Sequence, residues 1–192
     1  MKNNGKLPVI VLAGFSCAGK STISKRLASL CGFDLIDQHI VYKEIANAKG
    51  YERARYWLAD VGSEVFIRAT TLENVRRIND LKLSNGVIID ASCGPLMHNL
   101  MNSDLINARV INIAVTANED LRIMRIVRRM ACSDEEARTE LFFRDSILSE
   151  WKLEKVMKEA DFRVVNEDEI DHAVGQRIDW PTNRGIVKPL CN

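Results

Sequence analysis

The sequence predicts a three-layer α/β/α protein, in which helices cover both faces of a five-stranded parallel sheet. Five short apolar runs alternate with segments of helical periodicity, and strands that alternate with helices form parallel sheets covered on both sides. The chain has 192 residues, 46% of them hydrophobic, which is enough for one domain with a sizeable core. A glycine-rich segment separates the first apolar run from the first helical segment and marks the candidate ligand site.

Each predicted strand is a short run of mainly branched apolar residues. The third run is preceded by Asn85-Gly86, which is a turn signal. In chain order the predicted strands cover residues 9–13, 33–36, 87–90, 110–115 and 162–165.

Helical periodicity fills the intervals between these runs. Gly50 and Gly62 punctuate the long helical stretch after the second strand, and Ser133 followed by Glu136 is typical of a capped helix start. The predicted helices cover residues 20–31, 41–75, a segment through Leu121, Met124 and Val127, a helix from 134, and residues 146–160 and 168–178. The tail after Trp180 is expected to be irregular.

Composition and charge argue against several classes of protein. The net charge of +1 disfavours a protein built to coat nucleic acid or an acidic membrane. The five cysteines are odd in number and form no CxxC pair, which favours reduced thiols over disulfides or a zinc site. No apolar stretch is long enough for a membrane span. We therefore expect a soluble cytoplasmic protein.

Residues 14–22, GFSCAGKST, match the phosphate-binding (Walker A) pattern G-x-x-x-x-G-K-[ST] at every fixed position, with a strand before and a helix after. Backbone N–H groups and the helix N-terminus of such a loop surround phosphate oxygens. Lys20 is predicted to be catalytic by reaching the β- and γ-phosphates, and Ser21 to ligate Mg²⁺. The residues expected to bind ATP here are Gly14, Ser16, Cys17, Ala18, Gly19, Lys20, Ser21 and Thr22.

Three classes of nucleotide protein share this loop. A GTPase switch needs NKxD and DxxG segments, and neither string occurs in the chain. A motor-type ATPase usually has consecutive acids at the end of an aliphatic strand, whereas Asp90 is followed by Ala91. A small-molecule kinase needs the loop, an acceptor pocket and an arginine-bearing lid, and the chain has candidates for all three.

The segment GFSCAGKSTISKRLASLCGFDLID resembles the opening of P-loop small-molecule kinases, the superfamily that includes nucleoside-monophosphate kinases. The overall resemblance is closest to dephospho-CoA kinases, with features of cytidylate and shikimate kinases. It implies that Asp37, at the end of the second strand, orients or deprotonates the acceptor hydroxyl. The alternative is that Asp37 caps the next helix, and the two roles are compatible.

Residues 122–145, RIMRIVRRMACSDEEARTELFFRD, resemble the lid of dephospho-CoA kinases. The resemblance implies that Arg125 and Arg129, one helical turn apart, are catalytic residues that neutralise charge on the transferred phosphoryl group. Arg122 extends the same stripe, and Arg144 is a further substrate-binding candidate. The alternative is a solvated helix face whose arginines pair with Glu119, Asp120 or Glu135.

The segment EADFRVVN, residues 159–166, resembles the last strand of the same kinases and the turn that follows it. The resemblance implies that backbone around Asn166 touches the adenine. The alternative is that Asn166 only forms the turn.

Acceptor candidates come from the helices after the second strand and from the end of the third. DQHIVYK, residues 37–43, keeps the acid, the tyrosine and a positive charge of the cytidylate kinase segment DTGAMYR. His39 stands where dephospho-CoA kinases carry a second acid, and it is also a candidate proton carrier. Asp90 is a candidate for holding Mg²⁺ through water, with helix capping as the alternative. The predicted substrate-binding residues are Asp37, His39, Tyr42, Lys43, Asp90 and Arg144.

We expect one kinase domain with its core at about 7–121 and 146–178, a lid at about 122–145 and acceptor-side helices at about 39–80. The expected activity is Mg²⁺- and ATP-dependent phosphorylation of a small metabolite, with the ribose 3′-hydroxyl of dephospho-CoA as the first choice. A cytidylate (nucleoside-monophosphate) or shikimate type of kinase is the alternative. A different class remains open, namely an ATP-binding switch protein that transfers phosphate to no small molecule.

Overall fold

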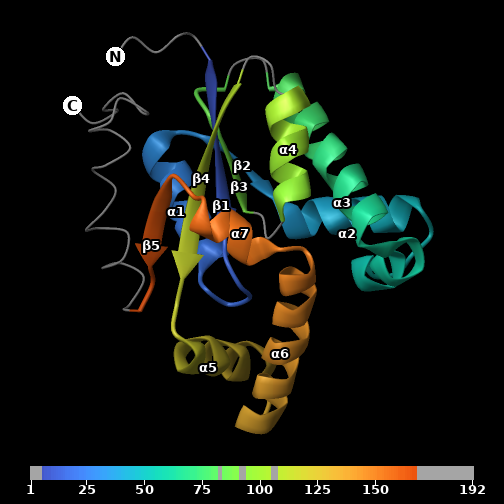
Figure 1. Cartoon of the computed structure of the whole chain (residues 1–192), viewed down its shortest axis with the longest axis vertical. Helices are drawn as coiled ribbons and strands as arrows, with labels where there is room; N and C mark the ends of the chain where they lie inside the picture. Colours follow the sequence, from blue (N-terminus) through green and yellow to red (C-terminus); the bar gives the residue numbers. More distant parts are fainter. Residues whose placement is uncertain (1–5, 82–83, 91–93, 105–107, 168–192) are drawn as a thin grey trace.

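The computed structural model describes residues 6–81, 84–90, 94–104 and 108–167. Its centre is a five-stranded parallel sheet with the strand order β2-β3-β1-β4-β5 (Figure 1). The strands are β1 Leu7–Ala13, β2 Asp34–Asp37, β3 Val87–Asp90, β4 Ala108–Thr116 and β5 Phe162–Val165. All five predicted strands are confirmed, with ends that differ by one or two residues.

Helices cover both faces of the sheet because β1 is apolar on both of its sides. Val9 and Val11 belong to one core cluster, whereas Ile10 and Leu12 belong to the other. The second cluster includes the buried face of α1 Lys20–Cys31. The first cluster is shared with α2 Gln38–Ala48, α3 Ala54–Asp80, α4 Pro95–Asp104 and α7 Leu153–Lys158. The predicted three-layer α/β/α architecture is confirmed.

The predicted lid region contains α5 Glu119–Met130 and the first part of α6 Asp134–Glu150. Both helices lie beyond the carboxyl ends of the strands (Figure 1). The predicted cap at Ser133 is confirmed, since its hydroxyl and the Glu136 carboxylate form a reciprocal capping box. The two helices pack through a small core of their own, which contains Ile123, Ile126, Ala137 and Leu141.

The prediction of one helix over residues 146–160 is wrong. Helix α6 continues to Glu150, and α7 begins only after Lys152, whose φ of 58° is left-handed. At this turn Trp151 is buried, and its carbonyl lies so close to Gly94 that a Cβ on that glycine would sit 1.6 Å from the oxygen. The predicted helix over 168–178 and the irregular tail lie outside the described residues.

The predicted punctuation of the long helical stretch is confirmed. Gly50 (φ 86°) follows α2, and Gly62 (φ 78°) interrupts α3 with a non-helical conformation. Glycine adopts such positive φ values without the penalty that a side chain brings. Helices α2 and α3 pack together with α4 on one side of the sheet (Figure 1). None of the helices in the described ranges is both long and apolar enough for a membrane span.

Candidate active site

The phosphate loop joins β1 to α1 and is pressed tightly against the end of the sheet. A Cβ on Gly14 would lie 2.3 Å from the Val115 carbonyl oxygen. A Cβ on Gly19 would lie 2.0 Å from Asn166 Nδ2, and Gly19 also has a left-handed φ of 99° as the N-cap of α1. Both fixed glycines of the pattern are therefore required by space, and Gly19 also by its backbone conformation.

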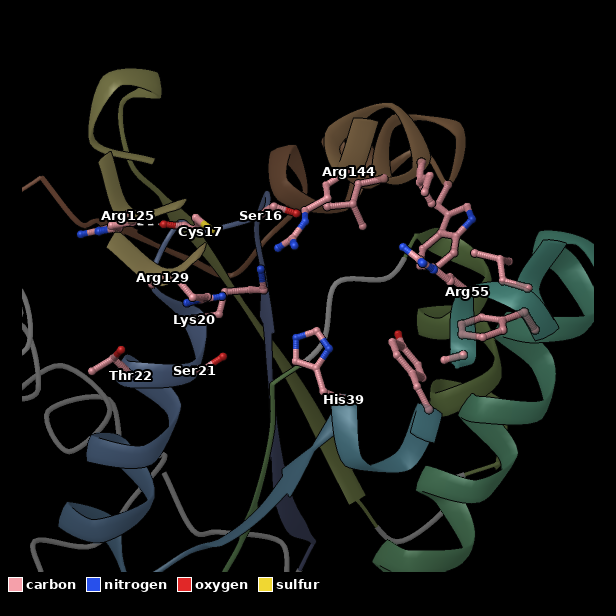
Figure 2. A pocket seen from close by; sticks show the side chains of 18 of the residues that line it. Ser16, Cys17, Lys20, Ser21, Thr22, His39, Arg55, Arg125, Arg129 and Arg144 are labelled. Atoms are coloured by element: carbon pink, nitrogen blue, oxygen red, sulfur yellow. Dashed lines mark hydrogen bonds between the residues drawn. The ribbon is translucent and has the colours of Figure 1, made fainter. Parts of the chain in front are cut away.

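Lys20 reaches back across the loop that it follows. Its ammonium group donates hydrogen bonds to the carbonyl oxygens of Gly14, at 2.8 Å, and of Phe15, at 3.0 Å. Ser21 and Thr22 continue the first turn of α1 beside it (Figure 2). An ammonium group and a helix N-terminus thus converge on the hollow of the loop, which is the arrangement that binds phosphate oxygens.

Two helices of the lid region hold the outer side of the loop through Ser16. Arg122 on α5 forms a 2.6 Å ion pair with Asp145 on α6. The Asp145 carboxylate accepts a hydrogen bond from the Ser16 N–H at 3.3 Å, and Arg122 donates one to the Ser16 carbonyl at 3.4 Å. The Arg122 guanidinium also lies 5.5 Å from the centre of the Phe15 ring. Arg122 is buried, so it braces the loop and does not extend an exposed arginine stripe.

Arg125, three residues after Arg122 on α5, contacts the same loop at Cys17. Its guanidinium donates to the Cys17 carbonyl at 3.0 Å and to the Asn166 carbonyl at 3.3 Å. Burial lowers the pKa of Arg125 from its usual range, although a guanidinium remains charged at neutral pH. Cys17 packs against the small α5–α6 core.

Asn166 supports the loop from behind. Its side chain is fully buried and donates through Nδ2 to the Ala18 carbonyl at 2.8 Å. Its backbone N–H bonds to the Thr116 carbonyl at 2.7 Å. Asn166 thereby ties the end of β5 and the end of β4 to the phosphate loop, a role beyond that of a turn residue. The sequence around Asn166 gives no sign of this role, because its partner Ala18 lies 148 positions earlier in the chain.

An open cavity of about 660 Å³ extends from the phosphate loop to α2, α3 and α6 (Figure 2). The loop side is lined by Ser16, Cys17, Gly19, Lys20, Ser21 and Thr22. Helices α2 and α3 contribute His39, Tyr42, Ala54, Arg55, Leu58 and Phe66. Helices α5 and α6, with the residue that follows α6, contribute Arg125, Arg128, Arg129, Arg144, Ile147, Leu148 and Trp151.

The far wall of this cavity is aromatic. The Phe66 ring lies 4.9 Å from the Tyr42 ring and 5.9 Å from the Trp151 ring, measured between ring centres. These distances are typical of favourable aromatic pairs. The sequence does not identify Phe66, Trp151 and the aliphatic residues beside them as cavity residues. Apolar residues at helical spacing give the same sequence pattern whether they line a cavity or fill a core.

The charge of the cavity is one-sided. Among the described lining residues no carboxylate occurs, whereas six are cations: Lys20, Arg55, Arg125, Arg128, Arg129 and Arg144. Arg144 points into the cavity from α6 (Figure 2) while its Nε donates to Glu140 at 2.6 Å. The alternative interpretation paired the arginines of α5 with acids such as Glu119 and Asp120. In the structure each of these two carboxylates instead lies 3.8 Å from the guanidinium of Arg138 on α6. Such a cavity attracts anionic ligands.

Most of the predicted site residues meet at this cavity. The lining includes Ser16, Cys17, Gly19, Lys20, Ser21, Thr22, His39, Tyr42, Arg125, Arg129 and Arg144. Six predicted residues do not line the cavity. Three of them shape or support the loop, namely Gly14, Ala18 and Asn166, and the others are Asp37, Lys43 and Asp90. Arg55 and Arg128 line the cavity as well.

Asp37 and Asp90 end neighbouring strands and are direct partners in the β2–β3 register. Asp37 caps α2, accepting a hydrogen bond from the His39 N–H at 2.9 Å, while Asp90 is buried. Asp90 and the Ser21 hydroxyl offer oxygen donors, but the described residues hold no cluster of three or more His, Cys, Asp and Glu side chains that could bind a metal ion by themselves. Mg²⁺ prefers oxygen donors, with a few protein oxygens completed by substrate phosphates and water. The residues therefore fit Mg²⁺ delivered with a nucleotide.

Comparison with known proteins gives two kinds of relative. The family described as chromatin associated protein KTI12 matches residues 7–93. The cytidylate kinase of Ignicoccus hospitalis is 30% identical over 144 residues, which span 73% of this chain and 76% of that protein. A shikimate kinase of Actinobacillus pleuropneumoniae is 31% identical over 119 residues, or 62% of this chain and 64% of that protein.

The fold is also found among solved structures. The shikimate kinase of Aquifex aeolicus superposes with a TM-score of 0.57 at 18% identity, covering 93% of this chain and 98% of that one. At this identity the similarity concerns the fold alone. Combined with the sequence relatives and with the complete phosphate loop, it leads to one assignment: the chain belongs to the superfamily of P-loop kinases that act on nucleotides and other small molecules.

Proposed function

We propose that the protein is an ATP-dependent phosphotransferase that moves the γ-phosphoryl group of ATP to a small anionic acceptor. The single observation that carries the proposal is the continuity of the cavity, which joins the phosphate loop to a second, aromatic compartment. A protein that only binds ATP needs no such second compartment. A kinase needs it, because the acceptor must lie next to the γ-phosphate.

The loop side of the cavity is the proposed ATP site. Backbone N–H groups of residues 14–22 hold the triphosphate, and Lys20 exchanges its two carbonyl partners for β- and γ-phosphate oxygens. Ser21 and Asp90 are the proposed Mg²⁺ residues. When bound, Mg²⁺ neutralises charge on the phosphate oxygens. Arg125 and Arg129 are the proposed lid charges that face the transferred group, with Arg125 already anchored to the loop through the Cys17 carbonyl.

The aromatic side of the cavity is the proposed acceptor site. Its rings suit a ring-bearing acceptor, and Arg55 and Arg144 suit a phosphate or carboxylate on that acceptor. Cytidylate, shikimate and dephospho-CoA all combine a ring with an anionic group. The named activities of the relatives favour a cytidylate or shikimate type of acceptor over dephospho-CoA. His39, Tyr42 and Lys43 lie on the helix beside this side of the cavity.

An ATP-consumption screen tests the proposal. ADP formation is measured with MgATP and, in turn, nucleoside monophosphates, nucleosides, shikimate and dephospho-CoA. We expect one anionic acceptor to accelerate ADP formation at least about tenfold, because binding in the second compartment aligns it with the γ-phosphate. Equal ADP formation with every acceptor would contradict the proposal.

Two substitutions sharpen the screen. Lys20→Ala is expected to lower acceptor-dependent turnover by about 10³-fold with the fold intact, since it removes a charge that contacts the transferred group. Lys25→Ala, which changes an exposed lysine on the same helix outside the cavity, is the matched control. Arg55→Gln is expected to raise the KM of the acceptor about tenfold or more and to leave the KM of ATP unchanged.

A second candidate function is an ATP-binding switch protein. The match of residues 7–93 to the KTI12 family favours it, because that family is described by its association with chromatin and not by phosphoryl transfer. The same screen separates the two functions. ATP hydrolysis that no acceptor changes, together with a MgATP-dependent change in proteolytic cleavage of α5 and α6, would support the switch.

A further inference from the structure

A shikimate type of acceptor receives the phosphoryl group on a hydroxyl, whereas a cytidylate type receives it on a phosphate oxygen. Transfer to a hydroxyl requires a group that takes the hydroxyl proton. Carboxylates are the usual candidates, yet no described residue that lines the cavity carries one. Asp37 does not line the cavity, and its Oδ1 already accepts the His39 N–H as the N-cap of α2. Asp90 is buried and does not line it either. The proton acceptor must therefore be sought among the other lining residues.

His39 has the position and the chemistry for this role. It is the second residue of α2, and its ring projects into the cavity between the loop residues Lys20 and Ser21 and the arginines of the far side (Figure 2). Arginine and lysine have no lone pair to offer when charged, whereas a neutral imidazole nitrogen accepts a proton near pH 7.

The surroundings of His39 fix its place. The Asp37 cap sets the start of α2 and thus the direction in which the side chain leaves the helix. The Tyr42 ring, one turn later, meets the imidazole edge to face at 6.3 Å between ring centres. These contacts leave the ring exposed on its cavity side, where an acceptor would cover it.

We propose that His39 is a catalytic residue that takes the proton from the acceptor hydroxyl. The proposal rests on the proposed function and gives His39 the role that resemblance assigned to Asp37. The acceptor oxygen forms a bond to the γ-phosphorus while the bond between that phosphorus and the β–γ bridging oxygen breaks. ADP leaves with the electron pair of the broken bond. The hydroxyl proton moves to the unprotonated imidazole nitrogen and then to solvent.

The test compares three variants with the acceptor found in the ATP-consumption screen. His39→Gln is expected to lower kcat by about 100-fold, a typical general-base contribution, with the affinity for a MgATP analogue unchanged. His39→Ala is expected to lose the same activity and to regain at least about tenfold of it when imidazole is added, because small bases can replace a missing one. Asp37→Asn is expected to keep most of the activity, since asparagine caps helices as well as aspartate.

The control is Ile40→Gln, which changes an exposed residue of the same helix that does not line the cavity. The proposal fails if both His39 variants keep kcat within about threefold of the unaltered protein. It also fails if Asp37→Asn loses as much as His39→Gln while imidazole restores nothing, because Asp37 would then be the base. If only nucleoside monophosphates accelerate ADP formation, the proposed function stands and this assignment fails, because no hydroxyl proton is removed. If no acceptor accelerates ADP formation in the unaltered protein, the proposed function fails as well.

Discussion

Asn166 shows how one side chain can set the shape of a catalytic loop without touching a ligand. It fills the space that a Cβ on Gly19 would need, and it holds the Ala18 carbonyl. Its Oδ1 has no hydrogen-bond partner among the described residues. A buried polar group in this position is costly unless the structure uses it, and here its amide nitrogen orders the loop.

The substitution Asn166→Ala tests this role. It removes the hydrogen bond to Ala18 and leaves a cavity behind Gly19, so we expect the free energy of unfolding to fall by about 1–3 kcal/mol. The affinity for MgATP is expected to fall as well, because the loop loses its support. Thermal unfolding with and without MgATP measures both effects. An unchanged midpoint in the absence of nucleotide would contradict the role.

At the scale of elements, the lid is attached to the loop by the Arg122–Asp145 pair. The pair joins α5 to α6, and both of its members bond to the backbone of Ser16. Because the pair is largely buried, removal of one partner leaves the other uncompensated.

A double-mutant cycle tests this attachment. Arg122→Ala and Asp145→Ala are each expected to cost about 3 kcal/mol of folding stability, whereas the double variant costs less than the sum, with a coupling of about 1 kcal/mol or more. Chemical denaturation measures the four free energies. Strict additivity would show that the two side chains do not act together.

A second pair of elements, α2 and α3, is joined by charged residues around Glu73. Glu73 bonds to Arg76 and Arg77, and Arg77 also pairs with Glu44 on α2. The hydrogen bond from Arg76 is the largest cause that lowers the pKa of Glu73 from 4.5 to about 2. The folded state therefore favours the ionised carboxylate, which stabilises the protein above pH 4.5 and ceases to do so as the pH falls toward 2.

Replacement of this carboxylate should change the acid dependence of stability. Glu73→Gln is expected to lower the free energy of unfolding at pH 7 by about 1–2 kcal/mol, and the difference from the unaltered protein should shrink between about pH 4.5 and 2. Glu64→Gln, which breaks an exposed pair with Arg68, is the control and should change stability little. A Glu73→Gln difference that stays constant with pH would contradict the assignment.

These elements also show what the sequence could predict. The phosphate loop was predictable because its pattern is local. The structure shows why glycine is needed at two of the fixed positions, since a Cβ on Gly14 or Gly19 would clash with neighbouring atoms. The strands were predictable because fully buried parallel strands are continuous apolar runs. The loop braces were not, since Asp145 lies 129 positions from Ser16 and only the folded chain brings them together.

The acceptor side was the least predictable part. Phe66 belongs to α3, and Trp151 lies at the break between α6 and α7 that periodicity did not reveal. Tyr42 and His39 were named from resemblance, but the aromatic residues Phe66 and Trp151 were not. Tertiary packing decides which apolar residues face a ligand, and the hydrophobic periodicity of a sequence does not reveal that packing.

At the scale of the whole molecule, charge is concentrated where the ligands are expected. The chain carries a formal net charge of only +1, yet six cations line the cavity, and no carboxylate lines it among the described residues. Carboxylates form ion pairs away from the cavity, for example Glu73 with Arg77 and Asp134 with Arg138. The fold thus presents an anion site without being a basic protein.

The central claim is that residues 14–22 hold a nucleoside triphosphate, and calorimetric titration with a non-hydrolysable ATP analogue and Mg²⁺ tests it most directly. We expect one analogue to bind per chain, with affinity reduced about 100-fold in Lys20→Ala and unchanged in Lys25→Ala. No binding to the unaltered protein, or equal binding to the Lys20→Ala variant, would contradict the account.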